Sequence, residues 1–414
     1  MALVVRHAEV VIREALTDTR VVLVNGARQV GKSTVVRTIA DSRGMVWRSL
    51  DDPVAREAAR QDPSDFVDLA PMVIDEVQRE PDLLLSIKHR VDTRNQSGDF
   101  LLTGSARVFG LRGVPDTMPG RVETVELWPF SQGEIGGDPD RFVDAAFALG
   151  PDLRLVSSLR RHDYAERVVR GGLPEAVARN APARRGRFLS SYVTQLIDRD
   201  VGELADIEHL QAMRQLVRLV AARSGQPLVP ATLANELGIH PRTASRYLSM
   251  LELIFMIKLV PAWSRNLKTR VTGHPKVAMV DSGVAAQLVR ASTESLTRPE
   301  APMGGLLEGF VLMELARQLS WNQTPAHLYH YRTRDGVEVD ALLESSDGKV
   351  VAVEVKASST VRGEDFQGLR HLKQRLGDDF VVGIVLYTGE QTHSFGSDLL
   401  AMPLSALWQV GATA

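Results

Sequence analysis

The sequence contains no cysteine at any of its 414 positions. Disulfide bonds, cysteine-ligated zinc or iron–sulfur sites and cysteine nucleophiles are therefore excluded, and the chain suits a reducing compartment. The sequence also lacks a charge excess of either sign, because 49 Lys and Arg residues face 51 Asp and Glu residues. A formal net charge of -2 gives no global attraction to nucleic acid or to a membrane, so any such affinity has to be local.

Long apolar runs are missing as well. No uninterrupted run approaches the roughly 18 residues of a membrane span, and the first residues lack the basic start and apolar stretch of a signal peptide. We therefore expect a soluble, cytoplasmic protein with no membrane partner. The ten histidines are scattered singly and without metal-ligand spacing, so no zinc site is expected.

The residues that are present suit a globular chain. With 44% hydrophobic and 24% charged residues, 414 residues are enough for two or three domains. In the first third, short β-rich runs alternate with helical patterns, which is typical of an α/β fold with a parallel sheet and crossover helices. The expected strands are residues 20–25, 45–50, 72–75, 100–103 and 122–127.

A glycine-rich segment directly follows the first expected strand. It fits the pattern G-x-x-x-x-G-K-[ST], and a helical pattern follows it. In such a loop, backbone N–H groups turn inward on phosphates, the lysine adds a point charge for the β and γ phosphates, and the hydroxyl ligates Mg²⁺. The residues expected to bind a nucleotide are Gly26, Ala27, Arg28, Gln29, Val30, Gly31, Lys32, Ser33 and Thr34.

Two carboxylates end the expected strand at residues 72–75. Asp75 is suited to the Mg²⁺ shell, together with Ser33, and Glu76 to polarising the water that attacks the γ-phosphate. At the end of the next strand, Thr103 and Ser105 are the two candidates to reach between the phosphate and the water. Either residue can equally start a turn. These motifs predict ATP and Mg²⁺ as ligands.

The three motifs, in this order, resemble those of AAA-type P-loop ATPases. The sequence looks most like a bacterial and archaeal subgroup whose C-terminal half is described only as a domain of unknown function. Further matches to that subgroup span most of the chain, at residues 50–53, 120–121, 127–131, 171–174, 198–200 and 281–283.

The resemblance implies an oligomeric ring or a site completed by a partner, with an arginine of the neighbouring subunit reaching the γ-phosphate. Arg107, Arg112 and Arg121 are candidates by position, and Arg121 is our choice. The turn at Gly171 to Pro174 resembles a Gly-x-Pro turn with which some related ATPases sense adenine, which makes Pro174 a candidate nucleotide contact. The same residues also fit a simple helix break.

Residues 228–262 carry the spacing of a helix-turn-helix. One helix ends at Gly238, and a second begins with Pro241, a position at which proline is tolerated. The second helix would enter a DNA major groove, and the apolar run 254–260 would form the first strand of a wing. The side chains expected to contact DNA are Arg242, Thr243, Ser245, Arg246 and Tyr247.

Local charge supports a DNA-binding module in this region. Between residues 207 and 276, ten Lys and Arg residues face three Asp and Glu residues. Such clustering favours contacts to phosphates. Winged helices also serve as protein-interaction scaffolds, so a protein partner is the alternative.

The last part of the chain carries a D…E-x-K pattern formed by Asp340, Glu354 and Lys356. The two carboxylates are suited to Mg²⁺, and Lys356 to orienting or activating water for attack on a phosphodiester. This pattern resembles that of the Holliday-junction resolvase and restriction-endonuclease group, the PD-(D/E)xK nucleases. Glu308 of this chain sits where these nucleases often place a fourth acidic residue. The alternative is a set of charges along a solvated strand edge.

We therefore expect four units: a P-loop AAA-type ATPase core at 1–135, a helical lid at 136–206, a winged helix-turn-helix at 207–275 and a restriction-endonuclease-like α/β domain at 276–414. The predicted function is Mg²⁺-dependent ATP hydrolysis by a homo-oligomer, coupled to DNA binding or remodelling. Two alternatives stay open. One is an ATP-controlled switch that assembles and binds a protein partner, and the other is an ATP-gated, metal-dependent nuclease.

Overall fold

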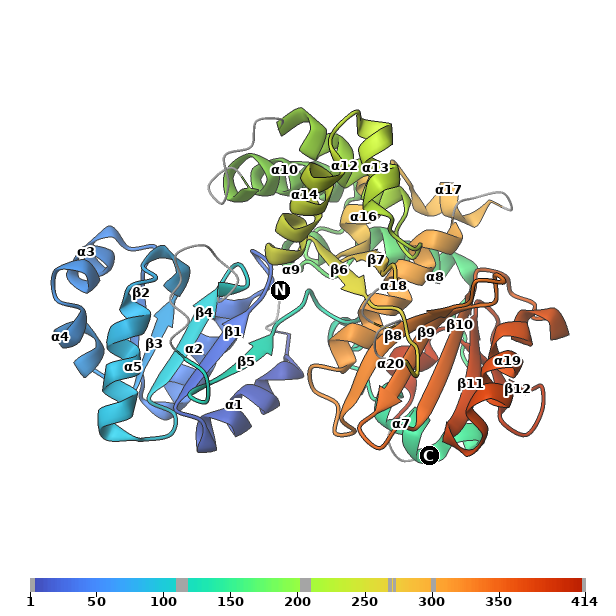
Figure 1. Ribbon diagram of the computed structural model, residues 1–414, viewed down its shortest axis with the longest axis horizontal. Coiled ribbons are helices and arrows are strands. Elements are labelled where there is room, and N and C mark those ends of the chain that lie inside the picture. Colours follow the sequence, from blue (N-terminus) through green and yellow to red (C-terminus); the bar gives the residue numbers. More distant parts are fainter. Residues whose placement is uncertain are drawn as a thin grey trace.

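The computed structural model describes residues 4–108, 118–201, 210–266, 270, 273–298 and 303–411, without the side chains of 199–201. Figure 1 shows three groups of elements: a first sheet with its helices, a second sheet with its helices, and a helical group above the space between them. The first group comes from the N-terminal part of the chain and the second sheet from the C-terminal part.

The first sheet consists of five parallel strands in the order β2-β3-β4-β1-β5. It confirms the five strands and the parallel α/β arrangement that the sequence predicts. The strands are β1 (Val21–Asn25), β2 (Val46–Ser49), β3 (Met72–Asp75), β4 (Phe100–Gly104) and β5 (Val122–Glu126), and the helices are α1 (Ala8–Asp18), α2 (Lys32–Arg43), α3 (Pro53–Gln61), α4 (Pro63–Asp68) and α5 (Leu83–Arg94).

Helices cover both faces of this sheet, because successive strand residues point to opposite sides. Helices α1 and α2 pack with Val22 and Val24 of β1, whereas α4 and α5 pack with Val21 and Leu23. All five strands run in one direction, so their C-terminal ends lie along one edge of the sheet, where ligands bind in open α/β folds.

The helical group joins residues from both halves of the chain. Helix α8 packs against α16 and α17, α10 packs against α16, and α7 packs against α20. In addition, Val156 forms a bridge with Gln391. The expected lid at 136–206 is therefore shared between this group and the C-terminal part. The helices from residue 132 to 201 are α6 (Gln132–Gly136), α7 (Phe142–Leu149), α8 (Arg161–Arg170), α9 (Pro174–Val177), α10 (Pro182–Gln195) and the π-helical Leu196–Val201. Two helices that α8 contacts are α16 (Ser282–Leu288) and α17 (Thr293–Thr297).

Three helices and a small hairpin follow in the order that the sequence predicts for residues 207–275. Strands β6 and β7 are antiparallel. Strand β6 begins three residues later than the expected wing strand, since Phe255 has a positive φ of 58° that interrupts an extended chain. Its partner β7 lies beyond the expected boundary at 275. These elements are α12 (Leu210–Ala222), α13 (Pro230–Leu237), α14 (Pro241–Leu253), β6 (Ile257–Val260) and β7 (Lys276–Met279).

The second sheet has six strands in the order β12-β13-β11-β10-β9-β8. Strands β8, β9 and β10 are antiparallel neighbours, whereas β10, β11 and β13 are parallel. Helix α18 packs on one face and α19 on the other. The elements are α18 (Met303–Gln318), β8 (Ala326–Arg332), β9 (Glu338–Ser345), β10 (Val350–Lys356), α19 (Gln367–Leu376), β11 (Phe380–Tyr387), β12 (His393–Ser394), β13 (Leu399–Pro403) and α20 (Ala406–Gln409).

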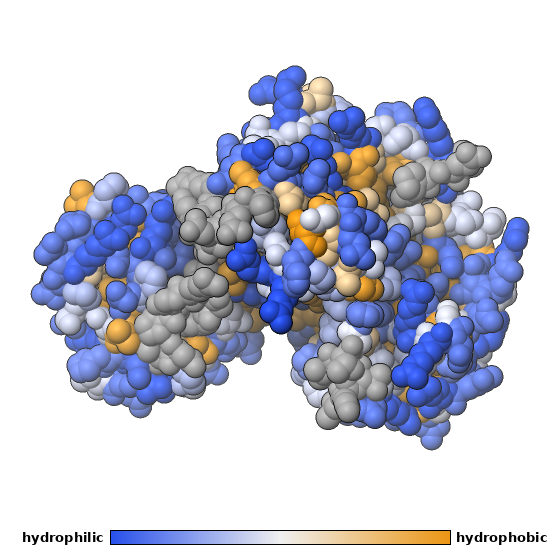
Figure 2. Space-filling model, turned by 45° about the horizontal axis from the view of Figure 1, so that its top comes forward, coloured by the Kyte–Doolittle hydropathy of each residue, from blue (hydrophilic) through white to orange (hydrophobic). Residues whose placement is uncertain are grey.

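The outer surface is mainly hydrophilic on the face that Figure 2 shows, with small separate apolar areas. Large exposed apolar side chains, such as Val54, Leu85 and Val156, come from different parts of the fold. Across the described ranges, every helix is too short or too polar to cross a lipid bilayer.

Candidate functional site

The loop between β1 and α2 lies at the edge of the first sheet where the parallel strands end. It runs from Gly26 to Gly31 and carries the phosphate-binding pattern. Gln29 and Gly31 have positive φ angles of 61° and 95°, so the backbone turns sharply just before α2 begins. The loop thereby curves around the N-terminus of α2, where free N–H groups favour an anion.

Lys32 places its ammonium group inside the curve of this loop. Its Nζ donates hydrogen bonds to the carbonyl oxygens of Gly26 and Ala27 and to Oγ of Ser105, each at 3.0 Å. Only 4% of the residue is exposed, so protein oxygens rather than water hold the charge in place. From this position the ammonium faces the space that nucleotide phosphates occupy in loops of this pattern.

The hydroxyl of Ser33 faces the end of β3. It donates to Oδ1 of Asp75 at 2.9 Å, and Thr103 donates to the same oxygen at 2.6 Å. A hydroxyl oxygen and a carboxylate side by side are hard oxygen donors of the kind that Mg²⁺ prefers. Ser33 and Asp75 therefore fit a magnesium ion held beside the loop.

Glu76 follows β3 and turns its carboxylate towards the lysine. Its N–H donates to Oγ1 of Thr103 at 2.9 Å, and its carboxylate accepts from Ser105 at 2.5 Å and from Gln78. Burial by itself raises the pKa of the Glu76 carboxyl, but the Lys32 ammonium and these two hydrogen bonds outweigh burial and lower it. Glu76 is therefore ionised at neutral pH and able to accept a hydrogen bond from water.

Sequence reasoning missed Arg6, which supports the outer side of the loop. Its guanidinium donates to the carbonyl oxygens of Val30 and Trp128, both at 2.7 Å, and to Oε1 of Glu134 at 2.9 Å. The residue is 4% exposed, so these contacts form a buried, fully paired cluster. No local pattern marks Arg6, because its partners lie 24 to 128 residues away.

Helix α18 reaches the segment that Arg6 supports. Arg317 donates to the carbonyl oxygen of Pro129 at 3.0 Å, and Glu314 accepts from the N–H of Gln132 at 3.1 Å. We call residues 127–136 the joint, because this segment connects the end of β5, the phosphate loop and a helix of the C-terminal part.

The turn before Pro174 is held by a carboxylate far along the chain. Oδ2 of Asp281 accepts from the N–H groups of Gly172 and Leu173 at 2.7 and 3.0 Å. Leu173 lines a small hollow beside Ala27 of the phosphate loop, whereas Pro174 begins α9. The structure thus brings the turn close to the loop, and the contact of Pro174 with a nucleotide stays a prediction.

The arginines that are candidates to act on a neighbouring subunit differ in position. Arg107 pairs with Glu252 of its own chain at 3.4 Å. Arg121 pairs with Asp92 through two hydrogen bonds of 2.6 and 2.9 Å, at the start of β5 and thus at the opposite edge of the sheet from the phosphate loop. Arg112 lies outside the described residues. The role of Arg121 in a partner's site stays a prediction.

Helix α14 presents most of the predicted DNA-contacting set to solvent. Arg242, Ser245 and Arg246 are exposed, and Thr243 is partly buried. The expectation for Tyr247 is wrong, because this residue is completely buried. It lies on the helical stripe that packs inward, one turn from buried positions on either side.

The basic surplus of residues 207–276 is largely neutralised in the fold. Acidic residues from other parts of the chain pair with it, in the pairs Arg214–Asp198, Arg265–Asp379 and Arg270–Glu344. Within the described part of this segment, the arginines without an ion pair are Arg218, Arg242 and Arg246. The charge count along the sequence overstates the positive field of this region, since it omits acids contributed by other parts of the fold.

The residues of the D…E-x-K pattern meet on β9 and β10. Lys356 donates to Glu354 at 3.1 Å. Burial, followed by the charge of Asp340, raises the pKa of both Glu308 and Glu354 to about 8. Sequence reasoning missed Lys276 of β7, whose Nζ lies 2.7 Å from Oδ1 of Asp340 and 3.7 Å from Oε2 of Glu308.

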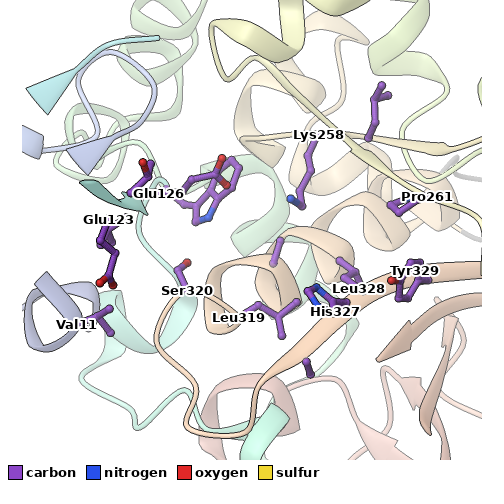
Figure 3. A pocket seen from close by; sticks show the side chains of 16 residues that line it. Val11, Glu123, Glu126, Lys258, Pro261, Leu319, Ser320, His327, Leu328 and Tyr329 are labelled. Carbon is purple, nitrogen blue, oxygen red and sulfur yellow. The ribbon is translucent and has the colours of Figure 1, made fainter. Parts of the chain in front are cut away.

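A cavity of about 490 Å³ lies apart from the phosphate loop, between the edges of the sheets (Figure 3). Glu123 and Glu126 of β5 lie on one side, and Lys258, His327 and Tyr329 of β6 and β8 lie on the other. Strands β5 and β8 are outer strands that do not pair with each other. At this place, open space therefore separates the first sheet from the second.

Three family models match consecutive parts of the chain. Residues 18–136 match the family described as AAA domain. Residues 161–295 and 303–407 match two families described as domains of unknown function, DUF8612 and DUF4143. The AAA match covers the first sheet, the phosphate loop and the joint.

Similar proteins occur among curated and solved proteins. An uncharacterised protein of Mycobacterium tuberculosis and one of Mycobacterium bovis are each 27% identical over 409 residues, which cover 98% of this chain and 85% of the relative. A Walker-type ATPase of Pyrococcus abyssi aligns with a TM-score of 0.43 and 15% identity, over 68% of this chain and 94% of its own. AMPPCP-bound DnaA from Aquifex aeolicus aligns with a TM-score of 0.29 and 14% identity, over 58% of this chain and 86% of its own. The RuvB Holliday junction branch migration motor of Thermotoga maritima aligns with a TM-score of 0.28 and 17% identity, over 61% of this chain and 87% of its own. By its family match and its loop geometry, the segment 18–136 is similar to the AAA domains of P-loop ATPases.

Proposed function

We propose that this chain binds ATP with Mg²⁺ and hydrolyses it. We also propose that the hydrolysis cycle changes the position of helix α14, whose exposed arginines contact DNA. One observation carries the first part of the proposal. Lys32, Ser33, Asp75 and Glu76 are joined by hydrogen bonds through the hydroxyls of β4 and its end, at the edge where the parallel strands terminate. The phosphate loop, the two oxygen donors suited to Mg²⁺ and the carboxylate suited to a general base therefore lie together at this edge.

Each residue has a defined task in this proposal. Lys32 exchanges its bonds to loop carbonyls for phosphate oxygens, and the N–H groups of the loop bind the same phosphates. Ser33 and Asp75 would hold Mg²⁺, which would supply positive charge beside the phosphates. The ionised Glu76 accepts a hydrogen bond from the attacking water, and its backbone is fixed by Thr103.

A short connection from the site to α14 supports the second part. Ser105 bonds both Lys32 and Glu76, and Arg107 follows two residues later. The N–H of Arg107 donates to the carbonyl oxygen of Leu253 at 3.0 Å, at the end of α14. A shift of Ser105 on nucleotide binding is therefore passed to the helix that carries the exposed Arg242 and Arg246.

The central test compares two substitutions in the phosphate site. Lys32→Ala is expected to abolish nucleotide binding, because the loop loses the buried ammonium group that faces the phosphates. Glu76→Gln is expected to keep nucleotide binding but to lower turnover by about 10²- to 10⁴-fold, the usual effect of removing a general base. Fluorescent-ATP binding and phosphate release measure the two effects. Glu390→Gln, which changes an exposed carboxylate paired with Arg160, is the matched control.

Turnover is then measured with duplex, single-stranded and four-way DNA. Stimulation of the parent chain, together with salt-sensitive binding, is the expected result. Unchanged hydrolysis in both phosphate-site variants would refute the ATPase. Normal hydrolysis without stimulation or binding by any DNA would refute only the coupling to DNA and favour a switch that binds a protein.

A further inference from the structure

Lys276 is a fully buried lysine surrounded by carboxylates. Its Nζ lies 2.7 Å from Oδ1 of Asp340, 2.9 Å from Oε1 of Glu338 and 3.7 Å from Oε2 of Glu308. None of its side chain is exposed. A lysine is buried to this extent only where anionic partners compensate its charge, so the ammonium and the carboxylates form one unit.

The backbone holds Lys276 in this position from two sides. Residue 276 pairs with Val260 of β6 and forms a bridge with Pro227 on its other side. The N–H of Leu228 also donates to the carbonyl oxygen of Pro275 at 2.7 Å. The ammonium is therefore carried by a strand whose backbone is held on both sides.

Three of the four carboxylate oxygens of the D…E-x-K pattern accept hydrogen bonds from the protein. Oδ1 of Asp340 accepts from Lys276, and Oδ2 accepts from the N–H of Val355 at 2.9 Å. Oε1 of Glu354 accepts from Lys356, whereas its buried Oε2 has no hydrogen-bond partner among the described residues. Among the residues that the structure describes, no group of three or more His, Asp or Glu side chains has an arrangement that could hold a metal ion.

Mg²⁺ needs carboxylate oxygens at about 2.0 to 2.1 Å and an octahedral shell. An ammonium group at hydrogen-bond distance from Asp340 and Glu338 fills the space and supplies the positive charge that such an ion would bring. The residues present thus do not fit the metal ion that the PD-(D/E)xK pattern implies. Burial lowers the pKa of Lys276, but Asp340, Glu308 and Glu338 outweigh burial and raise it, so the charge is permanent at physiological pH.

We propose that Lys276 is the resident cation of this carboxylate cluster, in place of a divalent metal, and that the C-terminal sheet is a structural module without nuclease activity. The ion-pair cluster fastens strand β7, which belongs to the hairpin beside the helix-turn-helix, to β9 and α18. Figure 1 shows β7 and α18 close together above the second sheet. This inference is independent of the proposed ATPase function.

The first experiment counts bound Mn²⁺ by electron paramagnetic resonance in the full-length, nucleotide-free chain. Both proteins in this comparison carry Asp75→Asn, so that the phosphate site does not bind Mn²⁺. One of them also carries Asp340→Asn. We expect the two proteins to bind the same number of Mn²⁺ ions. A bound Mn²⁺ that disappears with Asp340→Asn would overturn the proposal without any need for a Lys276 variant.

The second experiment replaces the ammonium. Lys276→Met is expected to lower the thermal midpoint by roughly 10 °C, because it leaves buried carboxylates without their partner. It is also expected to gain one Mn²⁺ site, with recovery of part of the lost midpoint when Mn²⁺ is added. Lys349→Met, which removes a partly exposed lysine of the same module, is the matched control. A folded Lys276→Met protein that gains no Mn²⁺ site would overturn the proposal, and Lys276→Gln gives the same readout if the Met variant does not fold.

Discussion

Thr103 and Ser105 lie two residues apart, and their hydroxyls divide the phosphate site between them. Thr103 is completely buried, donates to Asp75 and accepts from the N–H of Glu76. Ser105 accepts from Lys32 and donates to the carboxylate of Glu76. On the proposed assignment, the first hydroxyl therefore supports the residues that would hold the metal, and the second supports Lys32 and Glu76.

This division predicts different defects for two substitutions. Thr103→Val leaves the buried carboxylate of Asp75 without a hydrogen bond worth about 1.5–3 kcal/mol, so the Mg²⁺ concentration for half-maximal turnover should change by tenfold or more. Ser105→Ala should lower turnover about tenfold while Mg²⁺ dependence stays near that of the parent. Steady-state hydrolysis at varied Mg²⁺ measures both. Identical Mg²⁺ profiles for the two variants would contradict the assignment.

At the scale of elements, helix α14 carries two of the three arginines of the basic region that have no ion pair among the described residues, and the third, Arg218, lies on α12. Arg242 and Arg246 are exposed and have no ion pair among the described residues, and Arg107 fastens the far end of the same helix to the first sheet. A DNA-binding role of this region therefore depends on a few unpaired arginines, two of them on α14, and not on a broad positive surface.

Replacing these arginines tests the role of α14. Each phosphate contact contributes about one unit to the slope of log affinity against log salt concentration. Arg242→Ala and Arg246→Ala should each make the slope shallower by about one, and the double variant by about two. Fluorescence anisotropy with duplex DNA at several salt concentrations measures this. Arg362→Ala, an exposed arginine of the C-terminal part, should keep the parent slope. A double variant with the parent slope would exclude α14 as the contact.

The sequence predicts those features whose residues are neighbours along the chain. The loop between β1 and α2, the acidic end of β3 and the strands of the first sheet follow from the sequence because each depends on a short pattern with a fixed local geometry. Arg6 and Lys276 could not be found, since their partners come from distant elements. Tyr247 was misplaced because an exposed and a buried position differ by only one step around a helix.

At the scale of the whole molecule, the predicted oligomer should form in response to nucleotide. We expect Glu76→Gln to assemble into a larger species with ATP, because the uncleaved nucleotide holds the subunits together, and to be smaller without nucleotide. Light scattering after size exclusion measures the mass. Equal masses with and without ATP would contradict nucleotide-driven assembly.

If Arg121 acts in trans, Arg121→Ala should lower turnover relative to the parent chain while ATP binding is kept. Arg20→Ala, next to the same Asp92, is the control.

The bridge between Val156 and Gln391 has a consequence for synthesis on the ribosome. The two residues are separated by about 235 positions, which at about 5–20 residues per second take roughly 10 to 50 s to translate. The first sheet is complete at Glu126, so it can fold while the rest of the chain is still being made. The segment around Val156, however, has to wait for its partner, and during this interval its apolar side chains are available to chaperones.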